Sequence, residues 1–148
     1  MSFSSAQNTF VAGKYTEAKN LLITYLDRFP QGAFVPTSYY YLGECYFVEK
    51  DYDNALTNYQ TATEYDNTLY AENAKIQLGK IFFYNEDYRS AANIYEDLAK
   101  NTEYDYVAHN SEEQLMRCYK ALNEYDKTLS ISTAIYNRTT TPQEIKDE

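Results

Sequence analysis

The sequence predicts an all-α protein built from about four helical hairpins stacked in a row. A tyrosine followed three positions later by Ala or Thr recurs at Tyr15, Tyr52, Tyr88 and Tyr125, with spacings of 37, 36 and 37 residues. A fixed period in this range is typical of solenoid proteins. Glycine and proline are scarce, at 4 and 3 of 148 residues, which disfavours turn-rich β folds. Apolar residues recur at helical spacing on both sides of every break.

Each tyrosine follows a short polar break such as Lys50-Asp51, so each unit is predicted to be a helix, a tight turn and a second helix. Phe29-Pro30-Gln31-Gly32 ends the first unit, because Pro cannot continue a helix and Gly relieves the turn. The expected helix pairs cover 2–12 and 15–29, 35–49 and 52–65, 68–84 and 88–100, and 106–121 and 125–137. The repeats are then about 1–32, 33–67, 68–104 and 105–140, in a single array.

The C-terminal residues 141–148 are predicted to start a further helix. Thr141 precedes Pro142, and Glu144 follows three residues after Thr141, which is the pattern of a capping box at a helix start. The first unit also begins abruptly at Met1. These two features predict that the chain is a segment of a longer array.

Composition excludes several classes of function. The net charge is −9, and nucleic-acid binding needs a basic face. This acidity indicates either a solvated outer surface or a preference for basic partners. No apolar run reaches 18 residues, so the segment itself is not expected to insert into a membrane. Cys45, Cys118 and the single His109 give no zinc spacing, and no cofactor is expected. The motifs of hydrolases, P-loop proteins and zinc proteases are missing, so the chain is not expected to be an enzyme.

The second and third units resemble the tetratricopeptide repeat. The second reads Leu42-Gly43-x-x-Tyr46, then Tyr52-x-x-Ala55-x-x-x-Tyr59, and the third reads Leu78-Gly79-x-x-Phe82, then Tyr88-x-x-Ala91-x-x-x-Tyr95. The first unit has Ser5-Ala6 in place of Leu-Gly, and the fourth has Met116 for Gly and Thr128 for Ala. The period is longer than the usual 34 or so residues of the family. This longer spacing is similar to that of bacterial envelope members, which implies a periplasmic or envelope location, with the cytoplasm as the alternative.

The resemblance implies a right-handed superhelix of antiparallel hairpins, in which the first helices line a concave groove that binds a protein or peptide. Mapped by register, the groove is expected to be lined by Tyr40, Tyr41, Glu44, Phe47, Val48, Ile76, Gln77, Lys80, Phe83, Tyr84, Glu113, Arg117, Lys120 and Ala121. Several of these side chains are larger and more apolar than is usual for a surface without a binding role. The alternative is that they fill the groove against neighbouring first helices, or against a further unit.

Lys80 and Arg117 occupy the same register position in successive units. Together they are expected to hold a carboxylate or phosphate by charge-assisted hydrogen bonds, unless they pair with Glu44, Glu113 or another acidic side chain of the groove. Some family members clamp a terminal carboxylate with Lys, Asn and Arg. The matching positions in the second unit are Tyr40 and Glu44, so that clamp is not expected here.

The function that follows is a scaffold that binds a peptide or partner helix, anchored on aromatic side chains and oriented by Lys80 and Arg117. The main alternative is a structural segment that spaces a larger protein or self-associates through the ends of the array, with an idle groove. A carbohydrate or small-ligand site on the tyrosines is a third reading, based only on the aromatic content of 17%. Cys45 and Cys118 share a register position two units apart, too far for a disulfide, and are expected to be buried thiols.

Overall fold

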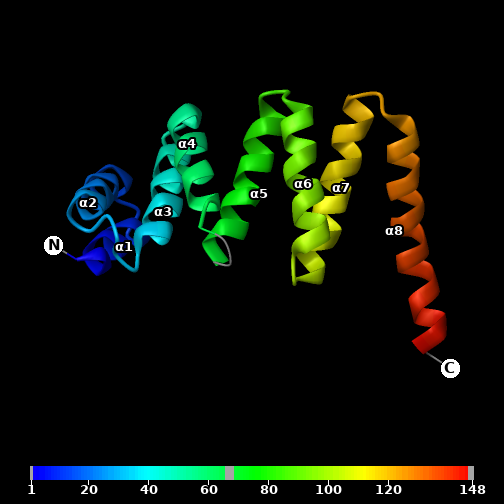
Figure 1. Ribbon diagram of the computed structural model, residues 1–148, viewed down its shortest axis with the longest axis horizontal. Coiled ribbons are helices and arrows are strands. Elements are labelled where there is room, and N and C mark those ends of the chain that lie inside the picture. Colours follow the sequence, from blue (N-terminus) through cyan, green and yellow to red (C-terminus); the bar gives the residue numbers. More distant parts are fainter. Residues whose placement is uncertain (1, 66–68, 147–148) are drawn as a thin grey trace. The chain divides into compact units, whose positions relative to one another are not determined.

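The computed structural model describes residues 2–65 and 69–146, and this part of the chain forms eight α-helices and no strand (Figure 1). The helices are α1 (Phe3–Val11), α2 (Tyr15–Arg28), α3 (Val35–Val48), α4 (Tyr52–Thr63), α5 (Leu69–Tyr84), α6 (Tyr88–Asn101), α7 (Asp105–Ala121) and α8 (Tyr125–Lys146). The predicted all-α fold of helical hairpins is confirmed, with most helix ends within two residues of the expected positions. The predicted start of the fifth helix at Thr68 lies outside the described residues.

The last helix differs from the expectation. α8 continues without a break from Tyr125 to Lys146, whereas the sequence predicts an end at Asn137 and a new helix from Thr141. The predicted break depended on the capping-box pattern of Thr141, Pro142 and Glu144, in which the proline lacks one backbone donor. No glycine lies between Tyr125 and Pro142, and the helix runs through this segment.

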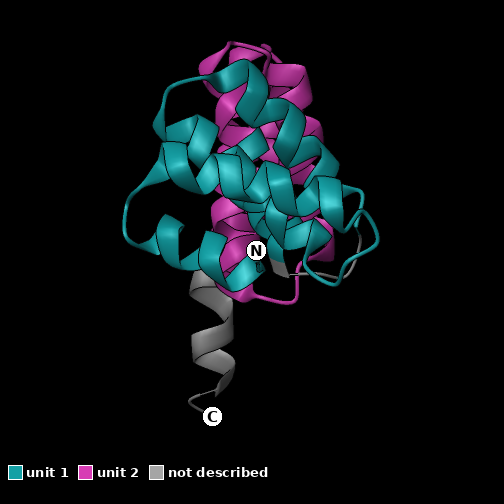
Figure 2. Ribbon diagram, turned by 90° about the vertical axis from the view of Figure 1, so that its left-hand side faces the viewer, with its two compact units in different colours: residues 1–78 teal, residues 79–148 magenta. Residues whose placement is uncertain are grey.

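The chain divides into two compact units, Met1–Leu78 and Gly79–Glu148, which Figure 2 colours separately. Unit 1 contains α1 to α4 and the first part of α5, and unit 2 contains the rest of α5 with α6 to α8. In unit 1, α1 packs on α2, α2 on α3, and α3 on α4. In unit 2, α7 packs on both α6 and α8. The second helices α2 and α6 therefore also contact the first helix of the following repeat, α3 and α7 respectively.

The turn inside each hairpin has the same geometry in all four repeats. One residue adopts a positive φ, namely Gly13 (81°), Lys50 (63°), Glu86 (63°) and Asn123 (62°). At Lys50 the following amide of Asp51 donates to the Tyr46 carbonyl at 2.9 Å, and the Lys50 amide donates to the Phe47 carbonyl at 3.0 Å. This pair of bonds is a Schellman motif, which satisfies the last carbonyls of the first helix. Asp51 then caps α4 by accepting from the Asn54 amide at 3.3 Å.

Replacing Lys50 with Gly should raise the free energy of unfolding by about 1 kcal/mol, because a side chain disfavours the left-handed conformation by about that amount. Glu86→Gly should have a similar effect in unit 2. Gln60→Gly is the control, since Gln60 is exposed within α4 and glycine lowers helix stability there by about 0.5–1 kcal/mol. Urea unfolding followed by circular dichroism measures the three variants. Equal destabilisation by Lys50→Gly and Gln60→Gly would contradict the role assigned to the turn.

Each hairpin closes on one small and one large side chain where its two helices cross. A Cβ added at Gly43 would lie 2.5 Å from the Tyr59 ring, and one at Gly79 would lie 2.6 Å from the Tyr95 ring. In the first repeat, Ala6 occupies the glycine position and Leu22 occupies the tyrosine position. Both side chains are buried, with 0% exposure. Glycine is needed in the second and third repeats because the tyrosine ring takes the space of any side chain on the first helix.

The fourth repeat reverses this size relation. Met116 stands where Gly43 and Gly79 stand, and Ser132 stands where Tyr59 and Tyr95 stand. The Ser132 hydroxyl donates to the Met116 sulfur at 2.9 Å. The large side chain has thus moved from the second helix to the first, and the two helices still meet at the same register position.

Candidate functional site

The first helices of unit 1 bring aromatic rings from three helices together. The ring of Tyr70 on α5 lies 5.4 Å from the Tyr40 ring and 6.0 Å from the Tyr41 ring, centroid to centroid. Tyr41 also contacts Phe10 of α1 at 4.7 Å and Phe3 at 6.1 Å. We call Phe3, Phe10, Tyr40, Tyr41 and Tyr70 the aromatic cluster. Apart from Phe3 its members are half-buried, so their rings both pack on one another and reach the surface.

Three polar side chains accompany the aromatic cluster. The Glu44 carboxylate accepts from the Tyr59 hydroxyl at 2.6 Å and from the Gln77 amide at 2.9 Å, both at Oε1. The Gln7 amide donates to the Tyr41 hydroxyl at 3.3 Å. Burial raises the pKa of Tyr59, and the hydrogen bond to Glu44 raises it further. Burial and the charge of Glu44 likewise raise the pKa of Tyr40, so both phenols stay protonated and can donate to the carboxylate.

Of the groove residues predicted in unit 1, the structure brings together Tyr40, Tyr41, Glu44 and Gln77. Phe47 instead packs edge-on against Tyr52 at 5.5 Å, Val48 is 48% exposed, and Ile76 is half-buried. The ring of Tyr41 fills space between neighbouring first helices, in line with the alternative interpretation of these residues. Contact of this surface with a ligand stays a prediction.

The sequence interpretation missed Gln7, Phe10 and Tyr70 as parts of this surface. The signal for Gln7 lies in the register, because Gln7 is 37 residues before Glu44 and so occupies the same place in its repeat. Phe10 is related to Phe47 in the same way. Tyr70 lies in the first turn of α5, ahead of the Leu-Gly pattern that sets the register, and only the packing of α5 against α3 reveals it.

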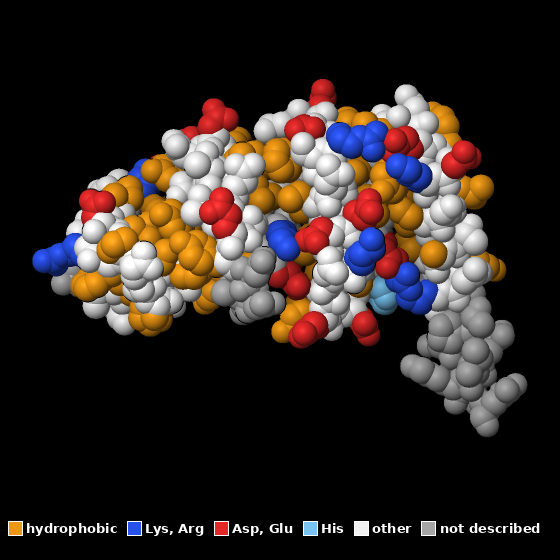
Figure 3. Space-filling model, in the orientation of Figure 1, with side chains coloured by type: hydrophobic (Ala, Val, Ile, Leu, Met, Phe, Trp, Pro, Cys, Tyr) orange, Lys and Arg blue, Asp and Glu red, His pale blue; other side chains and the backbone are white. Residues whose placement is uncertain are grey.

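The predicted residues of unit 2 form a more charged surface. Lys80, Glu113, Arg117 and Lys120 are all exposed, while Phe83 packs edge-on against Tyr88 at 5.1 Å. Tyr84 is 75% exposed. On the face shown in Figure 3, charged side chains gather over α6 and α7, whereas hydrophobic ones gather over α1 and α3. No ion pair to Lys80 or Arg117 is found within the described residues, so their pairing with Glu44 or Glu113 is not observed.

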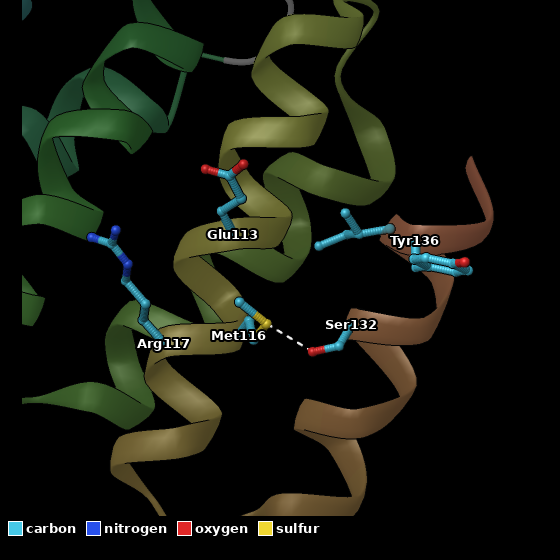
Figure 4. Close-up of a pocket in the computed structure, with 6 residues that line it drawn as sticks. Glu113, Met116, Arg117, Ser132 and Tyr136 are labelled. Atoms are coloured by element: carbon cyan, nitrogen blue, oxygen red, sulfur yellow. Dashed lines mark hydrogen bonds between the residues drawn. The ribbon is translucent and has the colours of Figure 1, made fainter. Parts of the chain in front are cut away.

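A hollow of about 440 Å³ opens between α7 and α8 in unit 2. In Figure 4, Met116 points toward Ser132 across this space, while Arg117 points away from α8. The hollow lies beside the Met116–Ser132 contact, where the second and third repeats place the buried rings of Tyr59 and Tyr95. Its lining residues are Glu113, Met116, Arg117, Ser132, Ile135 and Tyr136. The fourth repeat has neither the Gly nor the Tyr of the second and third repeats at these register positions. This difference is visible in the sequence and indicates that the interior of the fourth hairpin is packed differently.

The cysteines fit the prediction of buried thiols. Cys45 and Cys118 are both free and fully buried. Burial raises the pKa of the Cys45 thiol to about 12 and that of Cys118 to about 11, so both are protonated and poorly nucleophilic at neutral pH. Across residues 2–65 and 69–146, no group of three or more His, Cys, Asp or Glu side chains is placed to hold a metal ion.

None of the helices in the described part of the chain combines the length and apolar character needed to cross a membrane.

Comparisons with known proteins agree with this architecture. Residues 36–69, which cover most of α3 and all of α4, match the family model of the tetratricopeptide repeat. No curated protein sequence matches the chain. Among solved structures, the chain is similar to the nearly identical TPR-like repeats of a Podosopora anserina protein assigned as a kinesin light chain, with 16% identity and a TM-score of 0.65. That match covers 92% of this chain and 74% of the other.

A single-residue variant of the same Podosopora anserina protein matches with 15% identity and a TM-score of 0.64, covering 90% of this chain and 72% of that one. At this identity the likeness concerns the fold alone. The hairpin fold, the repeated crossing pairs and the matched repeat agree with one another, and repeats of this kind typically act as non-catalytic scaffolds for protein–protein contacts. Residues 36–69 thus match a tetratricopeptide repeat, and the chain as a whole has the fold of TPR-like repeats.

Proposed function

We propose that the chain is an interaction scaffold whose first helices bind a segment of a partner protein. The aromatic cluster of unit 1 carries this proposal. It offers half-buried rings from three helices, with a few placed polar groups such as Glu44 and Gln77 beside them. Binding surfaces for small segments are typically apolar and aromatic with a small number of oriented polar groups. Lys80 and Arg117 on the first helices of unit 2 are exposed cations that would orient a carboxylate of the bound partner.

Site-specific photo-crosslinking in the cell of origin tests the proposal. A benzophenone amino acid is placed at Val48 or at Lys80, both exposed on first helices, and as controls at Thr57 of α4 or Asn93 of α6, both exposed on second helices. The expected result is a crosslink to the same partner protein from Val48 and Lys80, with much less from the two controls.

Equal crosslinking from Thr57 and Val48 would contradict a role for the first-helix surface. Crosslinks from the first helices only to other copies of this chain would instead favour the alternative of a self-assembling structural segment. Circular dichroism of the four labelled proteins checks that the helices remain folded, since all four positions are exposed and should accept the label.

A further inference from the structure

Glu44 is the single charged residue of α1 and α3, the two helices that supply most of the aromatic cluster. α1 (Phe3–Val11) and α3 (Val35–Val48) contain no other charged residue, although 24% of the whole chain is charged. Gly43 and the ring of Tyr59 close the hairpin crossing, and the carboxylate serves this hairpin only through Oε1, which accepts from the Tyr59 hydroxyl. A charge placed alone in an aromatic surface is the arrangement by which binding surfaces select and orient a ligand.

Within the described part of the chain, the Glu44 carboxylate has hydrogen-bond donors but no counter-ion. Tyr59 and Gln77 both donate to Oε1, and no basic side chain of the described residues forms an ion pair with Glu44. An ionised carboxylate has about four acceptor positions over its two oxygens, so it can accept further donors. Glu44 is half-buried, and a partly desolvated charge gains more from a cation than a fully hydrated one does.

The same chain twice holds a lysine with a tyrosine ring and a glutamate. In unit 1, the Lys19 ammonium lies 4.9 Å from the centroid of the Tyr46 ring and 2.8 Å from Glu49 Oε2. In unit 2, the Lys127 ammonium lies 5.2 Å from the Tyr119 ring and 3.8 Å from Glu124. Each ring and carboxylate together provide a cation–π contact and an ion pair.

Tyr40 and Glu44 form a third pair of this kind, one helical turn apart on α3 and close enough for the carboxylate to act on the phenol. This pair has no lysine of its own among the described residues. The surrounding rings of Tyr41 and Tyr70 would cover the methylene groups of a long basic side chain, as such side chains commonly lie along apolar surface.

We propose that Glu44 and Tyr40 bind a lysine or arginine side chain of the partner segment, so that unit 1 selects basic partners. This inference rests on the proposed function, because it names the chemical class of side chain that the proposed surface binds. The balance of charge agrees: residues 1–78 hold nine acidic and five basic side chains, which would attract a basic segment during encounter.

A random-peptide library displayed on phage tests the inference with the whole chain as bait. Peptides that bind the wild-type protein are sequenced, synthesised and measured by fluorescence anisotropy against Glu44→Gln and Glu64→Gln. Gln keeps an acceptor oxygen for Tyr59, so Glu44→Gln should fold. Glu64 is exposed at the end of α4, and its change controls for the loss of one negative charge.

The expected peptides contain Lys or Arg, and Glu44→Gln should weaken their binding about tenfold, as removal of a charged hydrogen-bond partner does. Glu64→Gln should change the affinity for these peptides by less than about twofold, because an exposed charge contributes little to binding. Replacing the peptide's key lysine with norleucine should weaken binding to the wild type but not further weaken binding to Glu44→Gln.

Selected peptides that lack basic residues, or that bind Glu44→Gln normally, would overturn the inference and leave the proposed function standing. A library that yields no binding peptide would overturn both.

Discussion

Tyr59→Ser should lower the free energy of unfolding by about 3–5 kcal/mol, the range measured for removing a large buried ring. The Tyr59 side chain is fully buried, and its ring fills the space left open by Gly43. Its hydroxyl also donates to Glu44 at 2.6 Å, so the substitution removes a bond to a half-buried charge as well. Urea unfolding measured by far-UV circular dichroism gives the change.

The fourth repeat supplies a compensating change for the same position. Gly43→Met alone should destabilise the protein by about 1–3 kcal/mol, because the new side chain overlaps the Tyr59 ring. The double variant Gly43→Met with Tyr59→Ser copies the pair found at Met116 and Ser132. Its loss should be smaller than the sum of the two single losses by about 1–3 kcal/mol, the size of coupling between residues in contact. Strict additivity would show that the two helices do not meet through this pair.

Leu22→Ala should lower the free energy of unfolding by about 2–5 kcal/mol, since it leaves a cavity inside the first hairpin. Leu22 has 0% exposure and packs in the buried cluster with Ala6, Ala18 and Tyr25. The matched control is Ile23→Ala, at the next position of α2, where the side chain is 42% exposed. That change should lower stability by less than about 1 kcal/mol, because little apolar area is lost.

Hydrogen exchange separates a local effect of Leu22→Ala from a global one. In repeat proteins stability is approximately a sum of repeat and neighbour terms. Amides of α1 and α2 should therefore lose most protection, and those of α7 should lose least. Uniform loss of protection along the chain would mean that the array unfolds as one cooperative block. Equal effects of Leu22→Ala and Ile23→Ala would contradict the buried position assigned to Leu22.

The period of the sequence is enough to place the helices and the crossing residues. Leu-Gly followed by an aromatic residue, and Tyr-x-x-Ala after the break, together locate Gly43 beneath the second helix of its hairpin. The left-handed turn residues are harder to recognise. Gly13 and Asn123 are residue types that commonly adopt this conformation, whereas Lys50 and Glu86 adopt it without that signal, because the two flanking helices impose the turn.

The candidate surface is only partly predictable, because register says which side of a helix a residue occupies but not what approaches it. Tyr41 has the register of a groove residue, yet its ring is packed by Phe10 and Tyr70. Those contacts depend on how closely successive first helices approach, which the variable loops between repeats determine. The sequence suggests Glu44 as a partner of Lys80 or Arg117, whereas its observed donors are a tyrosine from its own hairpin and a glutamine of α5.

The alternation of small and large residues at the crossings has a consequence for folding fidelity. A first helix carrying Gly43 accepts a second helix with a tyrosine, but one carrying Met116 does not. A mispaired hairpin that joined α7 to α4 would force a methionine into the Tyr59 ring. The helices of the second and third repeats remain interchangeable at this contact, since both use Gly and Tyr. Helix exchange that would bring Met116 against a tyrosine, during synthesis or between neighbouring chains, is thereby disfavoured.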